Sequence, residues 1–216
     1  MTARGTADLR WTSRPAHAEA VVLVLHGGAE TSDHEVRWRD LAVLRLLPFA
    51  QAAKRAGGSR LAVARLRFAV KGWNGTDARP LHDARWALQQ VRAAYPGLPV
   101  GVVGHSMGGR VALQVAGDDD IRAVVALAPW VHQHDAPRGG PGTAVLVLHG
   151  ADDRITSPRA SEEFVQRLRA QGVDATFEED PGEGHALIRH ARAHHRRAAT
   201  WLRDRLLPGP EPARTS

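Results

Sequence analysis

The chain has 216 residues, no cysteine and a formal net charge of +6. This length suits a single α/β domain with a sizeable core. The lack of cysteine excludes disulfides and thiolate zinc sites. No apolar run reaches the roughly 20 residues that span a bilayer, and the N-terminus lacks a charged-then-apolar signal pattern. We therefore expect a cytoplasmic protein without a membrane span.

Basic residues are spread along the chain, and all of them are arginines except Lys54 and Lys71. The densest basic stretch, residues 189–197, falls in a predicted helix, where a solvated helix face is the simpler interpretation. A positive surface would attract anionic substrates. Charge alone does not predict a nucleic-acid partner.

Apolar strands alternate with helix-spaced segments along the chain. Residues 20–25 form a near-continuous apolar strand, and residues 37–56 have helical spacing that Pro48 is expected to kink or divide. Residues 1–17 are predicted to add one or two antiparallel strands, and the Pro-rich tail 208–216 to be disordered. The remaining predicted strands are 59–68, 98–103, 121–128, 143–148 and 175–179, and the remaining predicted helices are 80–95, 107–116, 157–170 and 187–206.

This alternation predicts an α/β fold, with a mostly parallel sheet and helices on both faces. No internal repeat or second domain is visible, so residues 1–207 are assigned to one domain. In open α/β sheets, reactive groups collect beyond the carboxyl ends of the strands. The candidate functional residues are therefore those that directly follow a predicted strand.

Residues 102–109 read V-V-G-H-S-M-G-G, a strand that breaks at G-x-S-x-G and turns directly into a helix. Gly104 and Gly108 flank the serine because side chains there would collide as the strand and helix close on each other. The turn lifts the hydroxyl of Ser106 above the sheet edge and leaves the N–H of Met107 free. Ser106 is therefore the candidate nucleophile of a nucleophile elbow. The alternative is a glycine-rich turn with a capping serine.

A serine nucleophile needs a base and a carboxylate that orients the base. Asp152 and Asp153 follow one predicted strand, and His185 follows the next strand in a glycine-rich loop. The chain order of serine, aspartate and histidine matches that of α/β-hydrolases. His185 is the candidate base, whereas either aspartate of the pair can be the acid, with Asp135 a distant third.

Four motifs occur in the expected order: H-G-G at 26–28, G-H-S-M-G-G at 104–109, H-G-x-x-D at 149–153 and G-x-G-H at 182–185. On these motifs the chain resembles α/β-hydrolase-fold serine hydrolases of the small lid-less esterase, lysophospholipase and dienelactone-hydrolase-like group, over residues 18–206. The resemblance favours Asp153 over Asp152, because relatives have a β-branched residue and a proline at the spacing found after Asp153. The dienelactone hydrolases usually have a cysteine nucleophile, so serine here favours ordinary esters.

By the same resemblance, the oxyanion hole pairs the N–H of Met107 with that of Gly28, and Ala29 is the neighbouring candidate. Trp73 and Trp130 follow strand ends and are candidates to wall an apolar acyl pocket. The connection at residues 129–142 is too short for a helical cap domain, so we expect an open site.

Other histidines are assigned structural roles. His26 and His149 each precede a glycine at a strand end and are expected to bond to loop backbone, while His105 is expected to pack beside the nucleophile. The H-x-H-D sequence at 132–135 lacks a fourth ligand, and no phosphate loop is present. We therefore expect no metal and no cofactor. Three histidines in a helical pattern are expected on the surface: His190, His194 and His195.

The sequence thus predicts a carboxylesterase-like serine hydrolase that cleaves small-molecule esters of small or medium acyl groups through an acyl-enzyme. Its predicted catalytic triad is Ser106, His185 and Asp153. A thioesterase or peptidase on the same fold, or a non-catalytic ligand-binding protein on a hydrolase scaffold, are the alternatives. Acyl length, stereochemical preference and oligomeric state are left open.

Overall fold

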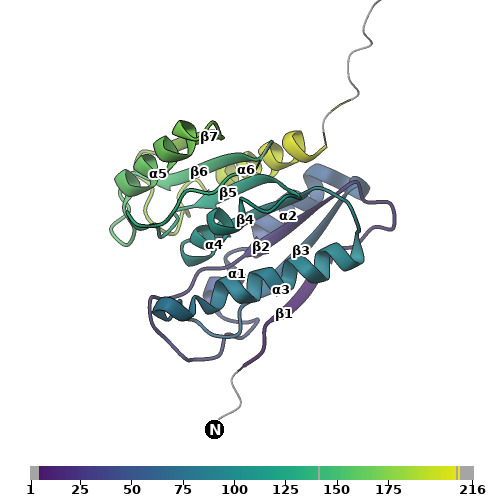
Figure 1. The fold of residues 1–216 in the computed structure, drawn as a ribbon, viewed down its shortest axis with the longest axis horizontal. Coiled ribbons are helices and arrows are strands. Elements are labelled where there is room, and N and C mark those ends of the chain that lie inside the picture. Colours follow the sequence, from purple (N-terminus) through teal and green to yellow (C-terminus); the bar gives the residue numbers. More distant parts are fainter. Residues whose placement is uncertain (1–4, 141, 208, 210–216) are drawn as a thin grey trace, which may run out of the picture.

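The computed structural model describes residues 5–140, 142–207 and 209. Apart from Gly209, the tail that we predicted to be disordered lies outside these residues. A seven-stranded sheet of order β1-β3-β2-β4-β5-β6-β7 forms the centre of the molecule (Figure 1). The strands are β1 (Asp8–Ser13), β2 (Ala20–Leu25), β3 (Leu61–Arg67), β4 (Val100–His105), β5 (Ile121–Leu127), β6 (Ala144–Gly150) and β7 (Asp174–Asp180).

Only the edge strand β1 runs antiparallel, against β3, and every other neighbouring pair is parallel. The predicted α/β fold is therefore confirmed, with one antiparallel strand from the N-terminal segment. The helices are α1 (Leu41–Leu44), α2 (Leu47–Gly57), α3 (Arg79–Ala94), α4 (Met107–Val115), α5 (Pro158–Ala170) and α6 (Ala191–Leu206), with short 3₁₀ turns η1 (Gly58–Arg60) and η2 (Gly75–Asp77).

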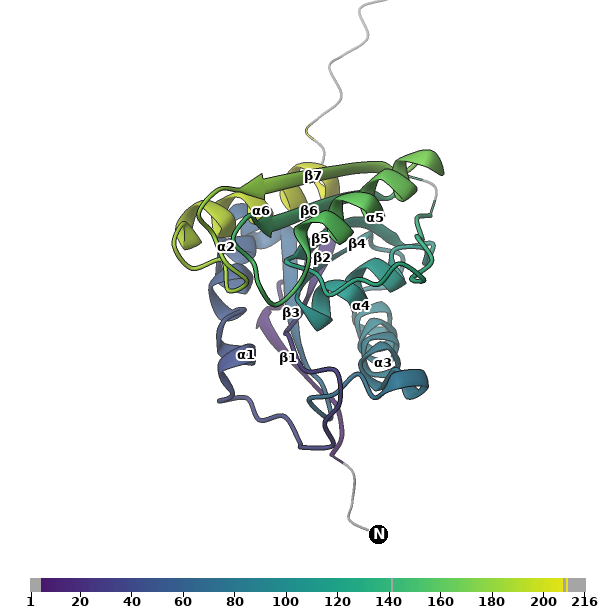
Figure 2. The same cartoon turned by 90° about the vertical axis from the view of Figure 1, so that its left-hand side faces the viewer.

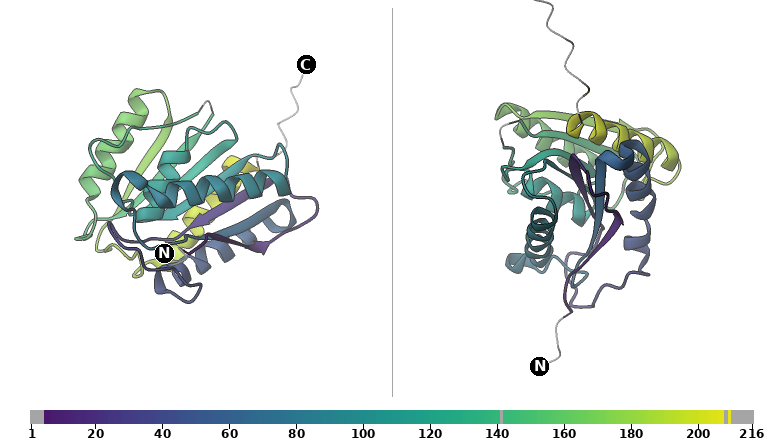
Figure 3. Two further views of the ribbon diagram at one scale, coloured as in Figure 1. Left: turned by 60° about the horizontal axis from the view of Figure 1, so that its bottom comes forward. Right: turned by 90° about the vertical axis from the view of Figure 1, so that its right-hand side faces the viewer.

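The helices form a layer on each face of the sheet: α1, α2 and α6 cover one face, and α3, α4 and α5 cover the other (Figures 2 and 3). Strand β2 is apolar throughout because it is buried on both faces of the sheet. Val21 and Leu23 belong to the core beneath α3 and α4, whereas Val22 and Val24 belong to the core beneath α2 and α6. A strand buried on both faces has no solvent side and so does not alternate.

The predicted division of segment 37–56 is confirmed, because it forms the two helices α1 and α2. Pro48 lies in the first turn of α2, where its missing N–H costs nothing. The last helix begins at Ala191 rather than near 187. Gly182 and Leu187 both have positive φ angles, of 79° and 50°, so the chain before α6 turns instead of winding into a helix.

The connection from β5 to β6 contains neither helix nor strand among its described residues, 128–140 and 142–143. The fold therefore lacks a substantial cap domain, and the carboxyl ends of the strands are not covered by one. Among the described residues, we find no helix whose length and apolar character would let it cross a bilayer.

Candidate active site

The turn between β4 and α4 is a strained elbow centred on Ser106. Ser106 has φ 56° and ψ −117°, a region that costs a non-glycine residue about 1–3 kcal/mol. A Cβ atom at Gly104 would overlap the backbone of Gly108, and one at Gly108 would overlap the carbonyl of His26. The predicted reason is therefore confirmed for Gly104, where β4 and α4 approach too closely for a side chain, whereas at Gly108 the close approach is between α4 and the end of β2.

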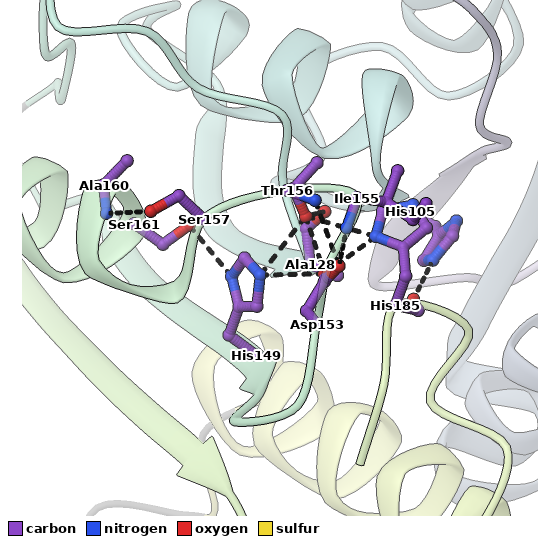
Figure 4. Close-up of polar contacts among 10 residues, drawn as sticks. All are labelled: His105, Ala128, His149, Asp153, Ile155, Thr156, Ser157, Ala160, Ser161 and His185. Carbon is purple, nitrogen blue, oxygen red and sulfur yellow. Dashed lines mark hydrogen bonds and ion pairs between the residues drawn. The ribbon is translucent and has the colours of Figure 1, made fainter.

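Asp153 and His185, which lie on separate loops beyond β6 and β7, meet in the structure (Figure 4). Nδ1 of His185 lies 2.8 Å from Oδ2 of Asp153. The Asp153 side chain is fully buried, whereas the His185 side chain is 16% exposed. Asp152 is exposed, and its backbone N–H donates to the carbonyl of Glu183 over 2.8 Å. Of the two aspartates, only Asp153 contacts the histidine.

The Asp153 carboxylate is held in its ionised form by hydrogen bonds. Burial alone would raise its pKa, but the N–H and hydroxyl of Thr156, the ring of His185 and the N–H of Ile155 outweigh burial and lower the pKa to about 2. The two N–H groups lie 2.7 and 3.0 Å from Oδ1, which leaves Oδ2 to face His185. Thr156 donates its hydroxyl to Oδ2 over 2.7 Å, a contact that the sequence did not suggest.

The loop that carries His185 is tied to the elbow by His105. Nε2 of His105 lies 2.8 Å from the carbonyl oxygen of His185, and the two rings are 4.8 Å apart. Among the hydrogen bonds of the described residues, none joins His185 to the Ser106 hydroxyl. Catalytic hydrogen bonds are often long without substrate and shorten in the complex. The structure thus places His185 beside the elbow without a direct bond to the serine.

Two other histidines were assigned to loop backbone. His26 behaves as predicted, because its Nδ1 faces the Gly27 carbonyl at 2.6 Å and its Nε2 accepts from the Phe68 N–H at 3.1 Å. For His149 the prediction is wrong. Its ring lies 3.0 Å from both Oδ2 of Asp153 and Oγ of Ser161, and it is fully buried behind the carboxylate (Figure 4). His149 therefore supports Asp153 from the side opposite His185.

Two backbone N–H groups, those of Gly28 and Met107, make no hydrogen bond in the part of the chain that the structure describes. The residues are in contact, since a Cβ atom at Gly28 would lie 2.6 Å from the sulfur of Met107. Ala29 is not available, because its N–H donates to the carbonyl of Lys71 over 2.8 Å. Gly28 is therefore the better candidate for the second donor.

Trp73 and Trp130 lie together beside the elbow. Their ring centroids are 6.3 Å apart, and the backbone N–H of Trp130 donates to the carbonyl of Ser106 over 3.1 Å. The guanidinium of Arg110 lies over both rings, 4.0 Å from Trp73 and 4.9 Å from Trp130, and pairs with Asp135 at 2.7 Å. Asp135, the third candidate for the carboxylate, thus pairs with Arg110, whereas His185 pairs with Asp153. Arg110 was not predicted from the sequence. The signal that could have revealed it is its spacing, because it lies four residues after Ser106, on the same face of α4.

The fold and this arrangement of residues define an α/β hydrolase. Residues 68–205 match the model of the dienelactone hydrolase family, and the chain belongs to that family. No curated protein sequence matches the chain.

Solved structures of three hydrolases share the fold. An α/β serine hydrolase without a lid from Xanthomonas campestris has a TM-score of 0.66 at 21% identity, over 94% of this chain and 91% of that chain. Esterase PE8 has a TM-score of 0.69 at 18% identity, over 94% of this chain and 100% of that chain. Est1E from Butyrivibrio proteoclasticus has a TM-score of 0.65 at 13% identity, over 92% and 93%. At these identities the likeness concerns the fold alone.

The buried histidines make the stability of the fold depend on pH. Burial lowers the pKa of His105 to about 3 and that of His26 to about 4. An unfolded histidine titrates near 6.5, so between that pH and about 4 the unfolded chain binds more protons than the native chain. Stability should therefore fall as pH falls, by about 2 kcal/mol for each of the two histidines at pH 5. The pKa of Asp153 lies lower, so its contribution is lost only below about pH 4.

Urea unfolding at pH 7 and pH 5 measures this loss. Between the two pH values, the His105→Gln variant should lose about 2 kcal/mol less stability than the original chain. The exposed His17 provides the matched control, since His17→Ala should leave the difference unchanged. Equal stability at pH 5 and pH 7 would contradict the prediction.

Proposed function

We propose that this chain is a serine hydrolase that cleaves carboxylic esters of small or medium acyl groups, with Ser106 as nucleophile, His185 as general base and Asp153 as the orienting carboxylate. The observation that carries the proposal is the 2.8 Å contact between His185 Nδ1 and the buried, ionised Asp153, beside a strained serine elbow. A carboxylate at Nδ1 keeps the proton there and leaves Nε2 as the base. Family membership supports the hydrolase class.

The proposed reaction has two steps. Ser106 Oγ attacks the ester carbonyl while His185 Nε2 takes the hydroxyl proton, and the developing oxyanion is stabilised by the N–H groups of Gly28 and Met107. The proton then passes to the departing alcohol, leaving an acyl-serine. A water molecule, deprotonated by the same imidazole, attacks the acyl-serine, and the acid leaves as Ser106 regains its proton.

The lack of a cap domain supports small or medium substrates that enter directly from solvent. Trp73 and Trp130 lie beside the elbow and are proposed to contact the acyl group. The guanidinium of Arg110 lies over both rings and is proposed to restrict how far a long acyl chain could extend on that side. An oxygen ester is the proposed substrate, and a thioesterase or a peptidase, which can use the same triad, is the alternative.

A fluorophosphonate probe tests whether Ser106 is activated. We expect one label per chain on the peptide that contains Ser106, as read by mass spectrometry, and none in the Ser106→Ala variant. The exposed Ser59 supplies the matched control, because Ser59→Ala should label like the original chain. A folded protein that takes up no label would favour the alternative of a non-catalytic ligand-binding protein.

Matched substrates then separate the reaction classes. Butyrate offered as a p-nitrophenyl ester, a thioester and an anilide should be cleaved fastest as the oxygen ester, with activity falling as the acyl chain is lengthened. Faster turnover of the thioester or the anilide at equal acyl group would replace the esterase proposal by a thioesterase or a peptidase.

A further inference from the structure

Four potential metal ligands meet where the loop that carries His185 joins α6. Asp180 ends β7, Glu183 lies in the following loop, His190 precedes the first residue of α6 and His194 lies in the first turn of that helix. One nitrogen or oxygen atom from each of the four lies within 4.8 Å of the other three. We propose that these residues form a binding site for a divalent transition metal of the zinc type.

The separations of these atoms suit a tetrahedral ion. Bonds of about 2.0–2.2 Å to nitrogen and oxygen place tetrahedral ligand atoms about 3.4 Å apart. The Asp180 oxygen lies 2.9 Å from Nδ1 of His190 and 3.0 Å from Nε2 of His194. The Glu183 oxygen lies 4.0 and 3.6 Å from the same two nitrogens. The four distances bracket the tetrahedral value, so small side-chain shifts would complete the site.

His194 supplies an independent observation. We expected it on the surface, but it is only 6% exposed, and its Nε2 is buried without a hydrogen-bond partner. The Asp180 oxygen lies 3.0 Å from this nitrogen but outside hydrogen-bonding geometry, so the nitrogen is near the other three ligand atoms and yet unsatisfied by them. An orphaned buried nitrogen is costly, and an ion between the four groups would satisfy it.

Glu183 also lacks an ordinary counter-charge. Its carboxylate is 1% exposed, and among the ion pairs of the described residues it faces no lysine or arginine. It accepts the backbone N–H of His190, and its other neighbours in the cluster are the two imidazoles and Asp180. Two carboxylates packed against each other repel, and a divalent cation would compensate both charges.

The donor set indicates which ion would bind. Two imidazoles and two carboxylates suit zinc and its first-row neighbours, whereas calcium and magnesium prefer sites built from oxygen alone. Four protein ligands fill a tetrahedral shell, so the ion would be structural. Since Glu183 lies two residues before His185, the bound ion would fasten the histidine loop to α6. The half-exposed His190 gives the ion access from solvent.

Metal binding is tested on chelator-treated full chain, and the readouts do not depend on the proposed esterase activity. Titration calorimetry with ZnCl₂ should give one ion per chain, and Zn²⁺ at about 100 times Kd should raise Tm by about 5 °C or more. Addition of CoCl₂ should give the visible absorption of tetrahedral Co²⁺, a spectrum that loosely bound surface ions would not produce.

Three variants complete the test. His190→Ala removes a half-exposed ligand, and His194→Gln keeps a buried polar side chain but removes the imidazole, so each should weaken binding at least 10-fold and abolish the Co²⁺ spectrum. His17→Ala removes an exposed histidine outside the cluster and should bind as the original chain does. Binding that persists in both cluster variants, or a full chain with neither stoichiometric binding nor a Tm shift, would overturn the proposal.

Discussion

Replacing Ser106 by alanine should lower kcat for p-nitrophenyl acetate on the order of 10⁶-fold, leaving only the residual catalysis that oxyanion donors and binding supply. The loss is large because His185 and Asp153 are proposed to serve the attack by this hydroxyl, and alanine has no nucleophile to activate. Alanine keeps the Cβ atom, so the strained backbone at φ 56° is unchanged, and the serine hydroxyl makes no hydrogen bond among the described residues. Tm should therefore stay the same while activity disappears.

The Ser59→Ala variant controls this measurement, because Ser59 is exposed and lies outside the elbow. It should retain full activity and the same Tm. Turnover in the Ser106→Ala variant within a few-fold of the original rate would remove Ser106 as the nucleophile, and with it the proposed esterase mechanism.

The neighbouring aspartates allow a comparison in which one position should matter and the other should not. Asp153→Asn should lower kcat by about 10⁴-fold, because an amide can donate to Nδ1 of His185 and so favours the tautomer with its proton on Nε2. The buried ring of His149 and the hydroxyl of Thr156 would lose their carboxylate partner as well, so some stability should be lost.

Asp152→Asn is the matched control, because the Asp152 side chain is exposed and makes no hydrogen bond among the described residues, while its backbone N–H donates to the carbonyl of Glu183. Its kcat should stay within about two-fold of the original value. Steady-state kinetics of both variants on one ester, with thermal unfolding of each, decide the matter. A large loss in Asp152→Asn with an active Asp153→Asn would reverse the assignment of the acid.

Much of the fold could be predicted from the sequence because parallel strands buried on both faces leave a strong local signal. The run Ala20–Leu25 is apolar at every position, and the structure buries every one of its residues. The elbow was equally readable, since the G-x-S-x-G pattern lies in one short segment and a Cβ atom at Gly104 would overlap Gly108, four residues away. The contact that excludes a side chain at Gly108 is instead with the end of β2, far away in the chain.

Helix starts were less predictable where positive φ angles intervene. Residues 187–190 have helical composition, but Leu187 adopts φ 50°, so the segment turns and presents His190 just before α6. That turn brings His190 and His194 to Asp180 and Glu183, which the spacing along the chain did not suggest.

The sequence by itself determined the order of strands and helices and the serine between two glycines. It also supplied the candidates for the base and the orienting carboxylate. Each of these was predicted from a pattern of residues within a short segment. Only the tertiary structure brought Asp153, and not Asp152, to His185, buried His149 behind the carboxylate and placed Arg110 over two tryptophans. These outcomes depend on which loops meet at the carboxyl edge of the sheet and on which side chains lose water there. Distances through space and burial, unlike local spacing, are properties of the packed chain.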